Sequence, residues 1–258
     1  MIVCKSRAEL EKMYHAGLVV WEVLNELRGM AQPGVTTKEL DEAAESRSAK
    51  HKVRPAFKNY KGYPASLCTS INTEVVHGIP SKSRRLAEGD IISLDFGVEF
   101  AGYYADAAVT VPVGEISPEL SRLLKVTREA LDRAIEQVRV GNRLTDISAA
   151  VQDCAERENG YSVVRDLCGH GIGTRMHEEP NVLNYGEPGR GPRLQEGMVF
   201  AIEPMVNVGR PEVRVLDDQW TAVTADGTPS AHFEHTVAVT ANGPWILTRP
   251  SELHGPSW

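Results

Sequence analysis

The stretch IISLDFGVEFAGYYADAAVTV, residues 91–111, decides the predicted architecture. Residues 91–98 predict a strand, Ala101-Gly102 would turn the chain, and residues 103–111 would return as the antiparallel partner. Asp95 and Asp106 interrupt these apolar runs, and a buried carboxylate is costly unless it is paired or binds a cation. Because side chains alternate along a strand, such a hairpin could bring both carboxylates to one face.

Helical periodicity lies on both sides of this hairpin. Apolar residues recur at helical spacing from Arg7 to about Gly29, Thr36 or Thr37 can cap a second helix, and an amphipathic helix is predicted from Pro118 to about Val140. Further strands are predicted at 161–164, 198–203, 220–224 and 232–239. The helical hairpin pattern near residue 34 recurs near residue 141. This predicts a mixed α/β (α+β) fold of two pseudo-twofold halves, with strands inside and helices outside, although two helical hairpins can align this loosely by chance.

Composition limits the possible classes of protein. The 258 residues carry 41% hydrophobic and 24% charged side chains and a net charge of −7, which argues against a protein that mainly grips nucleic acid. The sequence contains no run of about 18 apolar residues, so no membrane span is predicted. The four cysteines lack CxxC spacing, and the first residues do not resemble a signal peptide, so we expect a cytoplasmic protein. We expect one catalytic domain over residues 1–248 and a short tail over 249–258.

Five residues are candidate metal ligands because of their context: Asp95, Asp106, His170, Glu203 and Glu234. Each of the four acids interrupts an apolar strand, and His170 lies between two glycines. Taken singly, each is better explained as a salt-bridged or hydrogen-bonded structural residue. Brought together, four carboxylates would raise one another's pKa, and two divalent cations would remove that conflict. Alternation places Glu234 with His232 and Thr236 on one face, and His235 on the other as a weaker candidate at the surface or behind the ligands.

Several blocks of the chain resemble bacterial type I methionine aminopeptidases. They are Ser70-Ile71-Asn72 with Val76-His77-Gly78-Ile79-Pro80, Asp90-Ile91 with Asp95, Cys168-Gly169-His170-Gly171-Ile172-Gly173 with His177-Glu178-Glu179-Pro180, Ala201-Ile202-Glu203-Pro204-Met205-Val206, and Glu234-His235-Thr236. The resemblance runs from about residue 3 to residue 248. It implies the pita-bread fold and metal-dependent removal of the N-terminal methionine from nascent polypeptides whose second residue is small.

The resemblance also implies a role for each candidate residue. Asp95 and Asp106 would bind the second metal, His170 and Glu203 the first, and Asp106 and Glu234 would bridge both. The catalytic residues would be His77, His177 and Glu203, with His177 near the scissile carbonyl, His77 at the peptide nitrogen and Glu203 as proton shuttle. The substrate-binding residues would be Phe57, Tyr60, Tyr63, Cys68, His77, Met176, His177 and Trp220. Met176 and Phe57 depart from the usual family pattern, so we expect an altered pocket shape with unchanged chemistry.

The implied cofactors are two divalent ions, with Fe(II), Mn(II), Co(II) or Zn(II) all compatible with carboxylates and one imidazole. A monovalent cation, Na⁺ or K⁺, is implied near Asn72 and Ser230. The expected partners are nascent polypeptide N-termini and, transiently, the ribosome, with no membrane or nucleic-acid specificity, and the expected state is a monomer.

Two other functions compete with this interpretation. An X-Pro aminopeptidase or prolidase of the same fold would use a similar ligand set, but such chains usually carry a large N-terminal domain, whereas the helical pattern here begins at Arg7. A non-catalytic binding relative would typically lack some metal ligands, and all five are present.

Overall fold

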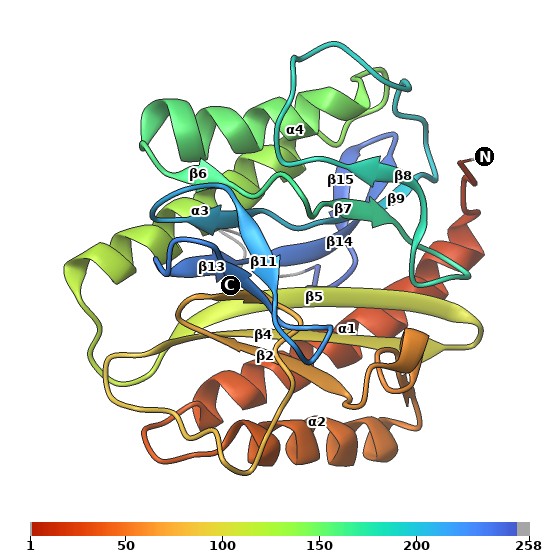
Figure 1. The fold of residues 1–258 in the computed structure, drawn as a ribbon. Coiled ribbons are helices and arrows are strands. Elements are labelled where there is room, and N and C mark those ends of the chain that lie inside the picture. Colours follow the sequence, from red (N-terminus) through yellow and green to blue (C-terminus); the bar gives the residue numbers. More distant parts are fainter. Residues whose placement is uncertain (1, 252–258) are drawn as a thin grey trace.

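The computed structural model describes residues 2–251 (Figure 1). The helices are α1 (Arg7–Met30), α2 (Thr37–His51), α3 (Pro118–Glu136) and α4 (Leu144–Gln152), with short helical turns at Tyr60–Gly62 and Asp153–Glu158. The strands are β1 (Arg54–Pro55), β2 (Leu67–Ile71), β3 (Glu74–Val76), β4 (Ile91–Phe100), β5 (Tyr103–Pro112), β6 (Ser162–Val163), β7 (Gly169–Gly171), β8 (Glu178–Val182), β9 (Val199–Ile202), β10 (Met205–Asn207), β11 (Val213–Val215), β12 (Ala222–Thr224), β13 (Ser230–His232), β14 (Glu234–Thr240) and β15 (Gly243–Ile246). From residue 252 on, the predicted tail lies outside the described residues.

The helices begin where the sequence supplies caps. At α2, the Thr36 hydroxyl accepts from the Glu39 N–H at 3.2 Å, while the Glu39 carboxylate accepts from the Thr36 N–H at 2.7 Å. This reciprocal pair satisfies backbone donors that a helix start leaves open, and it confirms the predicted cap. Helix α3 ends at Glu136, earlier than the predicted Val140, because the chain turns there and Gly141 adopts a φ of 94°.

The predicted hairpin is present as β4 and β5, the longest strands of a curled antiparallel sheet. Its order is β1-β4-β5-β14-β9-β7-β8, with β2 paired to β4 and β15 paired to β14. Asp95 lies opposite Ala108, and Gly97 lies opposite Asp106. Directly opposed residues point to the same face, so both acids share one face, as predicted.

The two halves of the sheet meet where β14 pairs with β5, with Glu234 opposite Ala108. Glu234 therefore lies on the face that carries Asp95 and Asp106. The predicted strand 232–239 is divided at Phe233: His232 ends β13 in a separate sheet with β10 and β6, and Glu234 begins β14. The prediction that His232 and Glu234 share a strand face is therefore wrong, because the chain changes sheets between them.

Helices cover the sheet on its outer side (Figure 1). Helix α1 packs on β4 and β5 with α2 beside it, and α3 packs with α4 over the second half. Their apolar faces and the outer face of the sheet form one buried cluster that includes Leu24, Phe96, Leu131 and Phe200. The opposite face of the sheet is left to carry the polar site. Within residues 2–251, no helix is both long enough and apolar enough to span a bilayer.

Candidate active site

A cavity of about 170 Å³ opens on the inner face of the sheet. The structure brings all thirteen sequence-predicted site residues to its walls: Phe57, Tyr60, Tyr63, Cys68, His77, Asp95, Asp106, His170, Met176, His177, Glu203, Trp220 and Glu234. These residues come from both halves of the sheet and from the loops around it. Residues far apart in the chain, such as Phe57 and Glu234, thus line one space.

Asp106 is held at the floor of the cavity by the neighbouring strand β14. The Thr236 hydroxyl donates to the Asp106 carboxylate at 3.1 Å and accepts from the Asp106 N–H at 3.1 Å. This fixes one carboxylate oxygen and leaves the other facing the cavity. Asp95 lies on β4, diagonally across from Asp106, because Asp95 is opposite Ala108 and Asp106 is opposite Gly97. One oxygen of Asp95 is buried without a hydrogen-bond partner in the protein.

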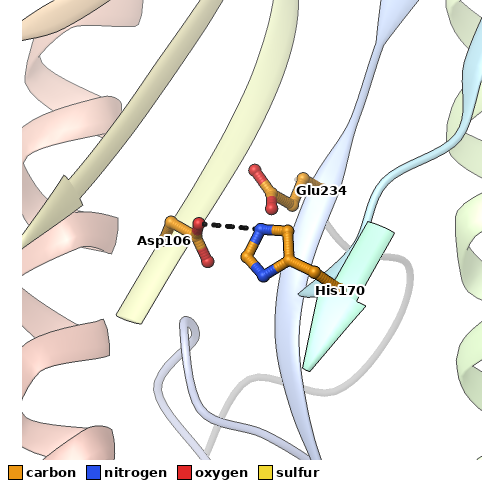
Figure 2. Close-up of side chains that lie close together, drawn as sticks. All are labelled: Asp106, His170 and Glu234. Carbon is orange, nitrogen blue, oxygen red and sulfur yellow. Dashed lines mark ion pairs between the residues drawn. The ribbon is translucent and has the colours of Figure 1, made fainter. Parts of the chain in front are cut away.

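Asp106, His170 and Glu234 converge from three different strands (Figure 2). One ligand atom from each lies within 4.8 Å of the others, and all three residues are buried. His170 Nε2 lies 3.7 Å from an Asp106 oxygen. The glycines beside His170 are required because β7 runs close to its neighbours: a Cβ at Gly169 would lie 2.3 Å from the Ala201 carbonyl oxygen, and one at Gly171 would lie 2.3 Å from that of Glu179.

Glu203 follows β9 and presents its carboxylate between two imidazoles. One oxygen lies 3.6 Å from His170 Nε2, and the other lies 3.6 Å from His232 Nε2. His232 is 1% exposed, and both of its ring nitrogens lack hydrogen-bond partners in the protein. His232 is not among the predicted site residues, because its contact with Glu203 depends on the change of sheet at Phe233.

Burial sets the electrostatics of this cluster. Desolvation raises the pKa of Asp95, Asp106, Glu203 and Glu234, and the charge of neighbouring acids raises it further for Asp95, Glu203 and Glu234. Within residues 2–251, the ion-pair partners found for these acids are imidazoles rather than lysines or arginines. Within the described residues, no lysine or arginine therefore offsets the repulsion among the four carboxylates.

Divalent cations fit this donor set. Four carboxylates and one imidazole match the ligands of hard and borderline metals, and a cation would compensate both the mutual repulsion and the orphaned oxygen of Asp95. The arrangement of five donors in one cavity is able to hold metal ions beside a substrate.

His177 lies at the rim of the cavity, next to the acids. Its ring centroid is 4.2 Å from that of His170, and its Nδ1 lies 2.8 Å from the Tyr60 hydroxyl. Desolvation, followed by the nearby His170, lowers the pKa of His177 to about 3 even though part of the side chain reaches solvent. His77 faces Trp220 edge-on at 6.3 Å, and burial lowers its pKa too. Both imidazoles are therefore neutral near pH 7.

An apolar compartment adjoins the acids. Tyr63, Cys68 and Met176 are buried in one cluster, with Tyr60 and Trp220 packed against it. Tyr63 meets Trp220 edge-on at 5.1 Å and donates to the carbonyls of Leu67 and Gly78. Phe57 packs on Gly97, where a Cβ would come within 3.0 Å of its ring. These walls form an apolar pocket next to the acids.

The sequence matches the metallopeptidase family M24 over residues 11–241. The chain belongs to this family. A methionine aminopeptidase of Clostridium acetobutylicum is 55% identical over 248 residues, covering 96% of this chain and 99% of that protein. The methionine aminopeptidase structure from Thermotoga maritima superposes with a TM-score of 0.95 at 46% identity, covering 97% of this chain and 100% of the other.

A prolidase structure from Pyrococcus furiosus is a more distant relative of this M24 chain. Its TM-score is 0.73 at 24% identity, and the match covers 97% of this chain but 66% of the prolidase. That likeness extends to the fold alone. The predicted α/β fold with an inner antiparallel sheet is confirmed, and its structural neighbours are pita-bread M24 enzymes.

Two features of this M24 site differ from what the sequence suggested. Lys61 also lines the cavity, and no pattern in the sequence marked it. His235 is 0% exposed, and its Nδ1 lies 2.8 Å from the Thr248 hydroxyl. The prediction that His235 could lie at the surface is therefore wrong, because β14 is covered on both faces.

The raised carboxyl pKa values predict how the metal-free protein responds to pH. The ordinary pKa is 3.8 for an aspartate and 4.5 for a glutamate. Above these pH values the unfolded chain loses protons that the buried acids of the folded protein keep. Stability then falls as pH rises toward the folded-state pKa. We expect the Tm of the metal-free protein to drop by more than roughly 2–4 °C, the equivalent of about 1 kcal/mol, between about pH 5 and pH 8.

Thermal scans with and without Mn²⁺ measure this effect. Metal-loaded protein should show a smaller drop or a rise over the same range, since bound cations favour the ionised carboxylates. If Tm changed with pH in the same way for the metal-free and metal-loaded protein, the four acids would not be metal ligands.

Proposed function

We propose that this chain is a metal-dependent methionine aminopeptidase that removes the N-terminal methionine from peptides with a small second residue. The observation that carries the proposal is the junction of five potential metal ligands with an apolar pocket in one cavity. Curated relatives that match almost the whole chain bear this name. The distant prolidase likeness supports an X-Pro peptidase less well, because it covers only part of that longer protein.

Asp95, Asp106, His170, Glu203 and Glu234 would hold two divalent ions of Fe(II), Mn(II), Co(II) or Zn(II). When bound, such ions lower the pKa of water and polarise a carbonyl. The position of Glu203, between two imidazoles and beside the other acids, suits it to accept a proton and return it to the leaving amine.

His177 would stabilise the oxyanion that forms at the scissile carbonyl. With its proton on Nε2, the neutral ring of His177 would accept from the Tyr60 hydroxyl at Nδ1, 2.8 Å away. The ring of His177 lies against that of His170, a predicted metal ligand, so the Nε2–H can reach a carbonyl bound there. Tyr60 can donate in this pair, because desolvation raises the pKa of its hydroxyl and so keeps it protonated.

His77 and the apolar pocket would orient the substrate. His77 has a φ of 62° and lies beside Trp220, where a neutral imidazole can accept from the peptide N–H. The pocket of Tyr63, Cys68, Met176 and Trp220 would take the methionine thioether, with Phe57 and Tyr60 at its edge. Cys68 acts as a wall rather than a nucleophile because burial raises the pKa of its thiol.

A monovalent cation, Na⁺ or K⁺, would bind near Asn72 and Ser230, which lie next to each other: the Ser230 N–H donates to the Asn72 carbonyl at 2.9 Å. Asn207 pairs with Ser230 in register, and its side-chain oxygen is buried without a partner in the protein. An oxygen in that setting is a suitable cation ligand.

We also propose a location, an oligomeric state and partners for the enzyme. It would act in the cytoplasm as a monomer on emerging polypeptide N-termini, with transient ribosome contact. Residues 1–248 would form one catalytic domain, since the ligands come from both halves of the sheet.

Release of free methionine from Met-Ala-Ser tests this function. We expect hydrolysis by the Mn²⁺-loaded protein, loss of activity on chelation and recovery on adding metal back. An Ala-Pro dipeptide is the discriminating control. Preferential cleavage of Ala-Pro would instead identify an X-Pro peptidase, and metal binding without cleavage of either peptide would indicate a binding relative.

A further inference from the structure

Lys5 and Glu178 form a buried ion pair directly behind the loop that carries Met176 and His177. Nζ lies 2.6 Å from a Glu178 oxygen, and the two side chains are 4% and 7% exposed. Lys5 also donates to the Val3 carbonyl at 3.0 Å. The pair thus fastens the segment before α1 to a loop far along the chain.

Glu178 organises this loop with its other oxygen. That oxygen accepts from the Arg175 N–H at 3.2 Å and from the Thr174 hydroxyl at 3.3 Å. One carboxylate therefore holds both the loop backbone and Lys5, and His177 is the residue immediately before it. Burial would raise the pKa of Glu178, but the hydrogen bond and charge of Lys5 and the loop N–H groups outweigh it, so its pKa is lowered.

The Lys5 side chain fills the space under the loop. A Cβ at Gly173 would lie 2.3 Å from Lys5 Cε and 2.6 Å from Nζ. The Lys5 N–H donates to the Gly197 carbonyl at 2.7 Å, and the Tyr104 N–H donates to the Gly173 carbonyl at 2.8 Å. The start of the loop and the lysine are both fixed to the sheet, so loss of the lysine side chain would leave the loop unsupported on that side.

We propose that Lys5 and Glu178 are positioning residues for the reaction, and that their ion pair holds loop 173–178 so that His177 faces the cavity. The inference rests on the proposed function, because it requires that His177 acts on the substrate. His177 depends on placement: its Nδ1 must stay 2.8 Å from the Tyr60 hydroxyl and its ring 4.2 Å from that of His170. A displacement of about 1 Å in such a group can reduce the rate by about 10²-fold.

The test is a double-mutant cycle in the full-length Mn²⁺-loaded protein with Met-Ala-Ser as substrate. Lys5→Met should lower kcat at least about tenfold, which is less than the loss of about 10²-fold expected for a full 1 Å displacement of His177. Its Mn²⁺ affinity, measured by calorimetry, should stay within about threefold, since the pair contacts none of the metal ligands. In a His177→Ala background, Lys5→Met should change kcat by less than about twofold, because the group that it positions is gone.

Equal losses in both backgrounds, or full activity in Lys5→Met, would overturn the inference. If Lys5→Met fails to fold, Glu178→Gln serves in its place, since it keeps an acceptor for the Arg175 N–H and removes the charge. It should show the same dependence on His177. Arg133→Met, which breaks a surface pair with Glu158 on the far helix, is the matched control and should leave kcat unchanged.

The role of His177 and the positioning role of Lys5 can be refuted separately. Unchanged activity in His177→Ala alone would remove His177 from the proposed function. A loss in His177→Ala, combined with an independent loss from Lys5→Met, would leave the proposed function intact and refute the positioning role.

Discussion

Replacing Asp106 with asparagine is expected to reduce both metal affinity and methionine release by more than about 100-fold, the upper range for residues that only support metal ligands. Asp106 is 2% exposed and lies at the centre of the cluster, within reach of His170 and Glu234. Asparagine keeps the shape and one oxygen for the Thr236 hydroxyl, so the change removes charge rather than packing.

The same substitution should stabilise the metal-free protein near pH 8. Removing one acid relieves the repulsion that raises the pKa of Glu203 and Glu234. Calorimetric Mn²⁺ titration and thermal scans of the metal-free form check the two effects together. Asp41→Asn is the control, because Asp41 is equally buried but caps the Ser66 and Leu67 N–H groups outside the cluster. A metal-free Asp106→Asn protein less stable than its parent would indicate a structural role instead.

His177→Ala should lower kcat by about 10²–10³-fold, as expected for loss of an oxyanion donor. The Mn²⁺ affinity should remain within about threefold of the parent, because the ring of His177 is tilted against that of His170 without belonging to the ligand cluster. Steady-state kinetics with Met-Ala-Ser and calorimetry on the same samples give both numbers.

Tyr60→Phe is the matched variant for this prediction. It keeps the ring beside His177 but removes the hydroxyl that would donate to Nδ1, so its kcat should fall by a smaller factor than that of His177→Ala. Wild-type turnover in His177→Ala, or a Tyr60→Phe defect larger than that of His177→Ala, would contradict the assigned role.

Local signals made much of this fold predictable. The β4–β5 hairpin has apolar strands and a glycine turn at Ala101-Gly102, and the start of α2 has a capping residue at Thr36. Such features depend on neighbours within a few residues, which the sequence displays directly. The end of α3 was misplaced because helical propensity continues past the point at which the turn at Gly141 takes over.

Long-range contacts were harder to predict. The four acids stood out because a carboxylate in an apolar strand is costly without a partner, and their mutual repulsion pointed to metal ions as that partner. The family resemblance then implied the role of each residue. Nothing local marked the contact of His232 with Glu203 or the pairing of Lys5 with Glu178, whose positions differ by 173. These contacts arise only when the two halves close around the cavity.

Crystals of the protein soaked with Mn²⁺ and measured at the manganese absorption edge would show whether the five potential ligands hold metal ions. We expect anomalous peaks inside the cavity, in contact with Asp95, Asp106, His170, Glu203 and Glu234. An empty cavity at saturating Mn²⁺, with the acids instead paired to lysine or arginine side chains, would contradict it.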